Sequence, residues 1–357
     1  MDAERETAAA YRTRVVNVER QAEAGTNLGA ELIRKGELVA FPTETVYGLG
    51  ANGLDGAAVT RIFEAKGRPA DNPLIEHVSK KSDVRALWMR VPRLAQTLMD
   101  AFWPGPLTLI AQKSDLVPME ATAGLDTVAV RMPRDRTARM LIAKSGVPIA
   151  APSANRSGRP SPTTARHVLE DMDGRIPLIL DGGPCQYGVE STVLSLCGEP
   201  TILRPGAVTL EMLEAVVGEV RVSESVLRPM KEGEVAASPG MKYRHYAPKA
   251  QVIVVNGPPE QAARRINALY REAEAEGIEC EIAATEQTKN FYRGKKYVIL
   301  GDRNQPETLC AGLFAALREM DGRADRIFAE GIPPEQEGLA YMNRLLRAAG
   351  FQVIEAE

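Results

Sequence analysis

Residues 223–250 divide the chain into two parts of unequal length, because they interrupt an otherwise regular alternation of strand-like and helix-like segments. This stretch contains Pro, Gly and Ser and shows no periodic spacing of apolar residues. Structureless segments of such length are usually either disordered or functional. Since it also holds Tyr243, His245 and Tyr246 among basic residues, we interpret it as a linker that contributes to function rather than as a plain tether.

The longer part, residues 25–222, is predicted to form a sheet covered by helices. Apolar runs typical of strands alternate with segments whose apolar residues recur at helical spacing. Strands outnumber helices, and the runs STVLSL and PTILR lie close enough in sequence to form a hairpin across Gly198. Because such short turns join antiparallel strands, we expect a mixed, twisted α/β sheet rather than a purely parallel one.

Capping residues predict where two helices begin and end. Asp55 is placed to cap a helix that runs to Lys66, and Gly67 is placed to end it. Thr26 is placed to cap a helix that runs to Lys35. The polar residues before Thr26 are expected to be frayed.

The shorter part, residues 251–357, alternates strand and helix more regularly. That alternation is typical of a parallel sheet with crossover helices, so we expect a small Rossmann-like C-terminal domain. It carries no Gly-rich phosphate loop. The sequence leaves open what this domain binds.

Composition limits the functions that remain. The 357 residues carry a net charge of −3 and a pI near 5.9, which argues against a general binder of nucleic acid or membranes. The N-terminal residues have no apolar core and no run reaches the ~18 apolar residues of a membrane span, so we expect a cytoplasmic protein with no membrane partner. Four scattered Cys and three His offer no zinc motif.

One loop, KGRPADNPL, carries two cations suited to an anionic ligand. Lys66 and Arg68 follow a helix end, with Asn72 and His77 downstream. A fixed Lys and a forked Arg suit a polyphosphate. The same charges also fit an ordinary helix C-terminus, where they interact favourably with the helix dipole.

Two further loops are candidates. APSANRSGRPSPTT follows a strand, the place where α/β sheets bind ligands, although its Ser and Asn residues are also common in turns. ILRPG puts Arg204 at a strand end, where a lone Arg is usually at the surface. Residues 131–175 hold nine Arg or Lys against four Asp or Glu. We therefore expect the loops to converge on one electropositive pocket.

A glycine pattern near the N-terminus resembles a dinucleotide-binding motif but lacks one of its required features. Gly48 to Gly53 match the G-x-G-x-x-G of dinucleotide sites, but such a site also needs an acidic residue about 20 positions further on. That region instead holds Lys66, Arg68 and His77. We therefore do not expect a dinucleotide cofactor.

Eight short motifs occur in order along the chain: FPTETVYGLG, KGRPADNPL, WPGPLT, VAVRMP, APSANRSGRPSPT, GVESTV, ILRPG and SPGMKYRHYAP. Together they closely resemble the threonylcarbamoyl-AMP synthases, the YrdC-like family in its long two-domain form. The resemblance extends roughly over residues 25–350 and is densest in the first domain. It implies a YrdC-like catalytic domain at 25–222, a lid at 223–250 and a Rossmann-like domain at 251–357.

The resemblance also implies an activity, that of an ATP-dependent nucleotidyltransferase. This family makes L-threonylcarbamoyl-AMP and pyrophosphate from L-threonine, bicarbonate or CO2, and ATP. The product serves the threonylcarbamoyl modification of adenosine next to the anticodon in certain tRNAs. A downstream threonylcarbamoyl-transferase machinery is therefore an implied partner, while a weak direct contact with tRNA is left open.

Site residues follow from the resemblance position by position. Those resembling ATP contacts are Lys66, Arg68, Asn72, Thr127, Ser153, Asn155, Ser161, Arg204 and, in the lid, Tyr243; we assign the catalytic role to Lys66 and Arg68. Those resembling threonine and carbamate contacts are Thr45, His77, Arg131, the Ala151 backbone and Ser191. Arg131 is expected to hold the threonine carboxylate as a fork. Mg²⁺ is expected to be carried by the triphosphate, with few protein ligands and no covalent catalytic residue.

Two other functions remain as alternatives. A basic cleft also fits a module that holds structured RNA by its shape and phosphates, although the acidic pI argues against it. A carbamoyl-transfer domain of the hydrogenase-maturation type shares the YrdC-like fold. That family carries C-x-x-C pairs, which this sequence lacks.

Overall fold

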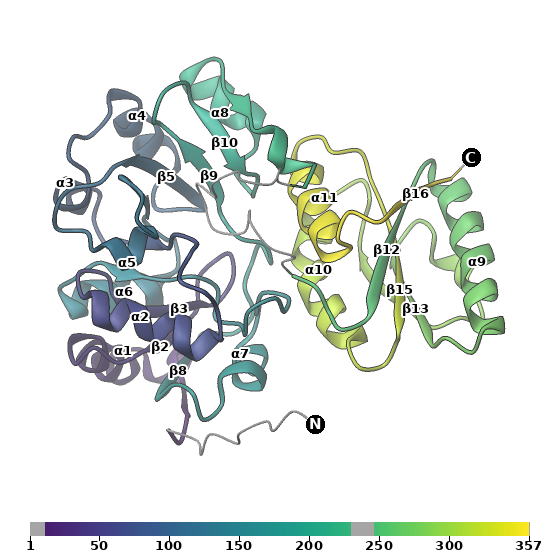
Figure 1. The fold of residues 1–357 in the computed structure, drawn as a ribbon, viewed down its shortest axis with the longest axis horizontal. Helices are drawn as coiled ribbons and strands as arrows, with labels where there is room; N and C mark the ends of the chain where they lie inside the picture. The colour runs from purple at the N-terminus through teal and green to yellow at the C-terminus, as the bar shows by residue number, and fades with distance from the viewer. Residues whose placement is uncertain (1–10, 230–245, 357) are drawn as a thin grey trace.

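The computed structural model describes residues 11–229 and 246–356, which form two lobes, each built around one sheet (Figure 1). The sheet of the larger lobe has eleven strands, and that of the smaller lobe has five. The α/β class with a mixed sheet and a second, parallel sheet is thereby confirmed, while the exact domain boundaries stay predictions. No described helix is long and apolar enough to cross a membrane.

The larger sheet mixes parallel and antiparallel neighbours. Its strands in spatial order are β1 (Arg14–Asn17), β8 (Leu178–Asp181), β2 (Val39–Phe41), β3 (Gly48–Asn52), β7 (Ile149–Ala150), β4 (Ile75–His77), β6 (Thr127–Arg131), β5 (Leu107–Gln112), β9 (Thr192–Ser195), β10 (Thr201–Arg204) and β11 (Arg221–Val222). Strands β9 and β10 form the antiparallel hairpin predicted from their short connection.

Helices cover both faces of this sheet. They are α1 (Val18–Arg34), α2 (Gly56–Lys66), α3 (Val84–Leu87), α4 (Arg93–Phe102), α5 (Met119–Thr122), α6 (Arg136–Ser145), α7 (Ala165–Met172) and α8 (Leu210–Val217), with two 3₁₀ turns, η1 (Lys81–Asp83) and η2 (Glu224–Val226). The predicted caps of α2 are confirmed: the Asp55 carboxylate accepts from two backbone N–H groups, and Gly67 adopts a left-handed conformation with φ 61°.

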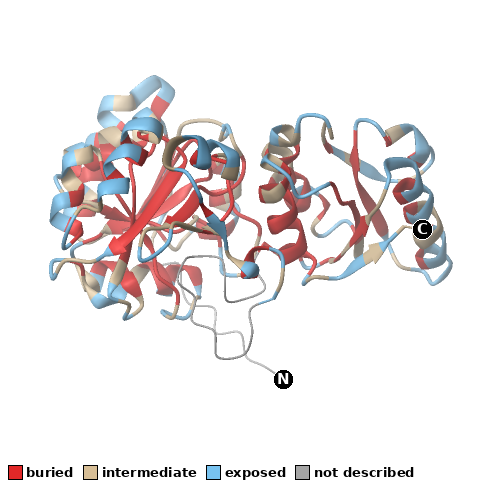
Figure 2. Ribbon diagram, turned by 90° about the horizontal axis from the view of Figure 1, so that it is seen from above, coloured by how far each residue is buried: buried red, intermediate tan, exposed pale blue. Residues whose placement is uncertain are grey.

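Successive residues of a strand point to opposite faces of a sheet, and in this lobe both faces are apolar. On β2, Val39 and Phe41 pack with α1 and α6, while the intervening Ala40 belongs to the core on the other face, with α2, α4 and α7. The strands therefore lie between two helical layers and are largely buried, as Figure 2 shows. This double burial keeps the strand ends rigid where they meet the loops.

The expectation for the N-terminal residues was wrong. Residues Arg14–Asn17 form β1, which pairs in parallel with β8, and α1 begins directly after it. The helix cap is Asn17, whose side-chain oxygen accepts from the backbone N–H of Arg20 at 3.1 Å. Thr26 lies inside α1 and its hydroxyl donates to the carbonyl of Ala22. Pairing with a strand some 160 residues away is invisible in a local sequence pattern.

The glycine pattern at Gly48 to Gly53 is not a phosphate loop. Most of it forms strand β3, which pairs antiparallel to β2 and β7. A Cβ on Gly50 would lie 2.7 Å from Ile149 and 2.8 Å from the Phe41 ring. Glycine is therefore required by close side-chain packing across the sheet rather than by a ligand.

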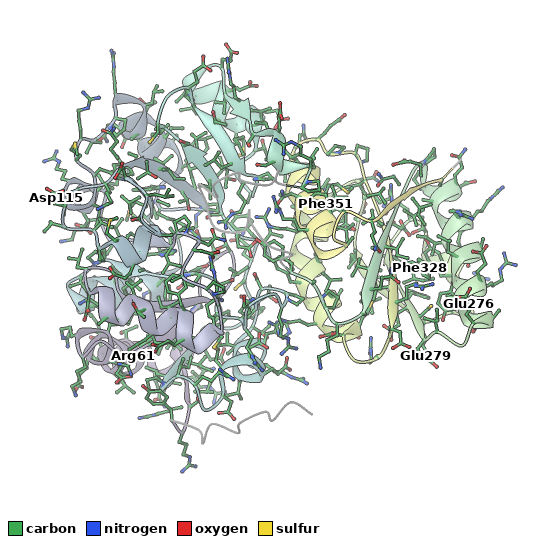
Figure 3. All side chains as sticks on the ribbon, in the orientation of Figure 1. Arg61, Asp115, Glu276, Glu279, Phe328 and Phe351 are labelled. Atoms are coloured by element: carbon green, nitrogen blue, oxygen red, sulfur yellow. The ribbon has the colours of Figure 1, made fainter. Side chains whose placement is uncertain are left out.

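The smaller lobe has an all-parallel sheet in the spatial order β14-β13-β15-β12-β16. Its elements are β12 (Gln251–Asn256), α9 (Pro259–Ala275), β13 (Cys280–Thr285), η3 (Lys289–Tyr292), β14 (Tyr297–Gly301), α10 (Pro306–Met320), β15 (Arg326–Glu330), α11 (Glu337–Ala348) and β16 (Val353–Glu355). The short edge strand β16 was not expected from the sequence. Figure 3 shows Phe328 of β15 inside this lobe and Glu276 at its outer side.

Helices α10 and α11 lie on the side of the smaller lobe that faces the larger one (Figure 1). Val46 and Val189 of the larger lobe belong to the same buried apolar cluster as residues of these two helices. Buried arginines add polar contacts: Arg318 of α10 donates to Asp171 at 2.7 Å and to the Pro160 carbonyl at 2.6 Å. Apolar packing and buried hydrogen bonds thus join the two lobes.

Glu76 on β4 is an unusual member of the interior. Its side chain is buried, and neither carboxyl oxygen has a hydrogen-bond partner among the described residues. Burial raises its pKa to about 8, because an ionised carboxylate is poorly solvated there. The side chain is therefore neutral in the folded protein at neutral pH.

We predict that Glu76 makes the protein less stable as the pH rises. Between pH 4.5 and about 8 the folded protein keeps this proton and the unfolded chain does not, so the free energy of unfolding falls across that window and then levels off. Urea unfolding at pH 5 and pH 8 should show a smaller loss for Glu76→Gln than for the wild type, by a few kcal/mol at most. Glu276→Gln, at an exposed position, is the control. An identical loss in all three proteins would contradict the assignment.

Candidate active site

Four neighbouring strands bring polar side chains to one level of the larger sheet. In the β4–β6–β5–β9 array, His77 pairs with Arg131, and Arg131 pairs in turn with Thr108. Ser191, which directly precedes β9, shares a 2.8 Å hydrogen bond between its hydroxyl and that of Thr108. Residues aligned across adjacent strands share a face, so these four side chains form a continuous polar floor.

Above this floor lies a cavity that opens to solvent. The residues that line it come from the strand ends and from the loops that follow them. They are Thr43, Thr45, Val46, Gly48, Lys66, Arg68, Ile75, His77, Arg131, Ala151, Pro152, Ser153, Asn155, Ser157, Gly158, Arg159, Glu190, Ser191, Arg204 and Tyr246. The cavity is therefore built from segments that lie far apart in the sequence.

Lys66 joins the first two candidate loops. Its side chain extends from the end of α2 into the loop after β7, where the ammonium donates to the carbonyl of Ser153 and, at 2.6 Å, to that of Asn155. The Ser153 hydroxyl donates to the Asn155 side chain, and the Ser157 N–H donates to the Lys66 carbonyl. Two loops that are nearly 90 residues apart in sequence are therefore held together at the cavity wall.

Two cations of the cavity wall, Lys66 and Arg204, are buried. Burial, together with the neighbouring Arg68, lowers the pKa of Lys66 well below its usual range. Burial likewise lowers the pKa of Arg204 to about 10. In both cases burial disfavours the charged form, because water no longer solvates it. An anion that enters the cavity therefore gains more than it would from the same cations at the surface.

Arg131 is the centre of the opposite wall. Its guanidinium donates to the Glu44 carboxylate at 2.6 Å, to the Thr45 hydroxyl at 2.9 Å and to the Gly105 carbonyl at 3.3 Å. Arg131 and Glu44 are both buried. Although burial opposes it, the pKa of Glu44 is lowered by Arg131, so this carboxylate is ionised. Several N–H groups of the Arg131 guanidinium, which was expected to bind a ligand carboxylate, thus already donate to groups of the protein.

His77 lies beside Arg131 on the cavity floor. Its Nδ1 lies 3.0 Å from the Ile75 carbonyl and 3.3 Å from that of Ile149, so this nitrogen carries the proton and Nε2 is an acceptor. Burial, followed by the charge of Arg131, lowers the pKa of His77 to about 3. The imidazole is therefore neutral at physiological pH.

Arg204 connects the remaining loops. Its side chain donates to the Ser191 carbonyl at 3.0 Å and to the Ser191 hydroxyl at 3.1 Å. The adjacent Glu190 accepts from the Ser161 hydroxyl and from Arg344 of the smaller lobe. The loops before β9 and after β10 therefore meet the Ser161 segment at one corner of the cavity.

Comparisons with known proteins agree with this architecture. Residues 31–206 match a family model described as telomere recombination, and residues 208–350 match one described as threonylcarbamoyl-AMP synthase, C-terminal domain. The chain is 50% identical over 346 residues to a threonylcarbamoyl-AMP synthase of Pyrococcus abyssi, covering 96% of this chain and 99% of that protein. It is also 50% identical over 328 residues to one of Bacillus subtilis, covering 91% and 93%.

A solved structure of Pyrococcus abyssi Sua5 in complex with L-threonine superposes with a TM-score of 0.89 at 48% identity, over 97% of this chain and 99% of that one. A variant of the same protein, in which a histidine and a tyrosine are replaced by alanine, gives a TM-score of 0.91 at 49% identity, over 96% and 98%. The chain belongs to the threonylcarbamoyl-AMP synthase family. It has the two-domain form, and it is an enzyme of the nucleotidyltransferase type.

Ten of the fourteen residues selected for a threonylcarbamoyl-AMP synthase site line this cavity. They are Thr45, Lys66, Arg68, His77, Arg131, Ala151, Ser153, Asn155, Ser191 and Arg204. The expected convergence of distant loops is thus present in the fold. The individual roles of these residues in binding ATP or threonine stay predictions.

The other four residues lie differently. Asn72 and Ser161 are fully buried one contact behind the cavity wall, where the Asn72 carbonyl accepts from Arg68 and Ser161 donates to Glu190. Thr127 does not line the cavity: it shares a strand face with Arg131 but begins β6, about 13 Å away along the strand. Tyr243 lies outside the described residues.

Sequence reasoning missed three residues that lie in or directly beside this cavity. Glu44 and Glu190 were present in the quoted motifs FPTETVYGLG and GVESTV but received no role. Their charge could have indicated a role, because a buried carboxylate among buried cations is expected to pair with one of them. Arg344 carried no local signal, since it contacts Glu190 from the other lobe. Among described residues, no group of three or more His, Cys, Asp or Glu is placed to hold a metal ion.

We predict that His77 stays neutral through the range in which a free histidine titrates. Its pKa is lowered to about 3, so the Nδ1–H tautomer should persist from pH 8 to pH 5. Nitrogen-resolved NMR of histidine side chains measures this directly, with His77→Gln used to assign the signal. A midpoint near 6.5 for the His77 signal, the ordinary value for a free histidine, would contradict the assignment.

Proposed function

We propose that this protein catalyses the ATP-dependent synthesis of L-threonylcarbamoyl-AMP and pyrophosphate from L-threonine, bicarbonate or CO2, and ATP. The product would serve the threonylcarbamoyl modification of adenosine next to the anticodon in tRNA. The observation that carries the proposal is a cavity in which a polar strand floor adjoins a wall that carries Lys66, Arg68 and Arg204. The likeness to a relative solved in complex with L-threonine supports it.

The strand floor offers suitable partners for threonine. Thr45 and Ser191 present hydroxyl groups, and Arg131 contributes the N–H donors that Glu44 and Thr45 do not use. Because His77 is neutral with Nε2 as an acceptor, it can take a hydrogen bond from the threonine without adding charge. We therefore assign the amino acid to the side of the cavity formed by β4, β6 and the start of β9.

The loop side suits the nucleotide. Lys66, Arg68 and Arg204 present positive charge there, and Ser153 and Asn155 offer short polar groups. Mg²⁺ is proposed to enter on the triphosphate as part of the substrate, since oxygen-rich phosphates are ligands that it prefers. The two ligands would then meet where the floor adjoins the wall.

The reaction that we infer needs positioning more than it needs a covalent residue. The threonine amine adds to CO2 and loses a proton, which gives a carbamate. A carbamate oxygen forms a bond to the α-phosphorus of ATP as the bond to pyrophosphate breaks. Holding both substrates in line and stabilising the charge on the phosphates supplies most of the acceleration in such transfers.

The linker is proposed to close over the bound substrates. Residues 230–245, including Tyr243, lie outside the described part of the chain. Tyr246, the first described residue after them, lines the cavity, which supports a linker path beside the nucleotide. We further propose that the enzyme acts in the cytoplasm and passes its product to a threonylcarbamoyl-transferase.

Pyrophosphate release should require threonine and bicarbonate together, measured with a coupled phosphate assay after pyrophosphatase. Lys66→Ala should lower the rate about 10²–10³-fold, because one fixed cation is lost from the phosphate site. Lys35→Ala, an exposed lysine outside the cavity, should leave the rate unchanged.

Two outcomes would reject this function. Folded protein that releases no pyrophosphate with all three substrates, but does turn over carbamoyl phosphate, would indicate a carbamoyl-transfer enzyme. Salt-dependent RNA binding that survives Lys66→Ala, without any turnover, would indicate an RNA-binding module.

A further inference from the structure

One side chain of the smaller lobe contacts a residue that lines the cavity of the larger one. Arg344 lies on α11 and is completely buried. Its Nε donates to the Glu190 carboxylate at 2.7 Å, and an Nη donates to the carbonyls of Glu190 at 3.2 Å and Pro205 at 3.0 Å. The other Nη donates to the side chain of Asn343 at 2.6 Å. This guanidinium therefore holds two loops of the catalytic lobe at once.

Both loops carry residues of the nucleotide wall. Glu190 itself lines the cavity and precedes Ser191, and Pro205 follows Arg204. Arg204 donates to Ser191, so the two loops are tied to each other directly beside the Arg344 contact. If Arg344 is changed, Glu190 and Pro205 lose a partner. Pro205 is the chain neighbour of Arg204, and Glu190 is the chain neighbour of Ser191, to which Arg204 donates.

Glu190 is an anion in a cavity suited to anions. Burial alone would favour its neutral form, but Arg344, Arg204 and the Ser161 hydroxyl lower its pKa, so the carboxylate is ionised. An unpaired carboxylate at this place would repel a triphosphate. Arg344 neutralises it from behind the wall, so the charges of Arg204 and Lys66 stay available to the triphosphate.

Arg344 also contacts the end of the linker. Its guanidinium lies 5.8 Å from the centre of the Tyr246 ring, and that ring packs on Phe314 of α10 at 5.0 Å. Tyr246 lines the same cavity. The smaller lobe therefore supports the cavity at two adjoining places through one residue.

We propose that Arg344 is a positioning residue for the nucleotide, by which the C-terminal domain completes the ATP site of the catalytic domain. It holds Glu190 as a neutralised pair and fixes the loop that carries Arg204. This inference rests on the proposed function and adds a role for the second domain within it.

Another buried arginine of the same interface provides a matched comparison. Arg318 pairs with Asp171, which has a second partner in Arg159 and does not line the cavity. Loss of Arg318 removes interdomain contacts of the same kind without leaving an unpaired carboxylate in the cavity. Arg318→Met therefore separates simple docking of the lobes from an effect on the nucleotide site.

The experiment is a binding titration of Mg²⁺ with a non-hydrolysable ATP analogue, using the full chain and isothermal calorimetry. Arg344→Met should weaken nucleotide binding by about 10-fold or more, because a buried carboxylate loses its partner beside the phosphates. Arg344→Met/Glu190→Gln should recover most of that loss, and Arg344→Lys should stay within about 3-fold of the wild type, since it retains the charge. Arg318→Met should also stay within about 3-fold.

Several results would overturn the inference. The wild type and Arg344→Met could bind the nucleotide with equal affinity, or the double variant could fail to recover affinity. Arg344→Lys could also lose as much affinity as Arg344→Met. If Arg344→Met does not fold, the double variant and Arg344→Lys still decide, because neither leaves an unpaired charge. A wild-type protein that binds no nucleotide would instead contradict the proposed function itself. In turnover assays, Arg344→Met should raise the KM for ATP, whereas a merely structural defect would lower only the amount of active enzyme.

Discussion

The structure depends on the burial of positive charge in one cavity. Lys66, Arg131, Arg204 and Arg344 are all buried, and carbonyl groups together with Glu44 and Glu190 hold them in place. Burying a charge is costly unless it is paired or hydrogen bonded. Burial lowers the pKa values of Lys66 and Arg204, because their charged forms are poorly solvated there. The fold therefore keeps cations in a place that a polyanion would stabilise.

The sheet makes this arrangement possible. Both faces of the larger sheet are covered by helices, so its strand ends are fixed and the loops after them start from defined positions. Aligned neighbours on β4, β6 and β5 form the floor, and the end of α2 delivers Lys66 to the wall. Arg344 of α11, in the second lobe, holds Glu190 at one corner of the cavity. Each lobe thus contributes to the same site, although their sheets are separate.

Local signals in the sequence predicted much of this fold. Asp55 and Gly67 bracket α2 as expected, since capping is decided by residues adjacent in the chain. The β9–β10 hairpin was predicted for the same reason. The N-terminal strand was missed because its stability comes from pairing with β8, and Thr26 was mistaken for a cap because it is a good cap residue that here lies inside a helix.

For the site, too, local sequence motifs were informative and long-range contacts were not visible in the sequence. The motif order identified residues such as Lys66 and His77, whose positions the fold then brought together. Arg344 could not be found this way, because its importance arises only when α11 packs against the larger lobe.

The most direct test is to solve the structure of the full chain with threonine and a Mg²⁺-bound, non-hydrolysable ATP analogue. We predict the triphosphate beside Lys66, Arg68 and Arg204, with threonine within bonding reach on the floor at His77 and Arg131. Ligands bound at separate places, or phosphates remote from these cations, would contradict this prediction.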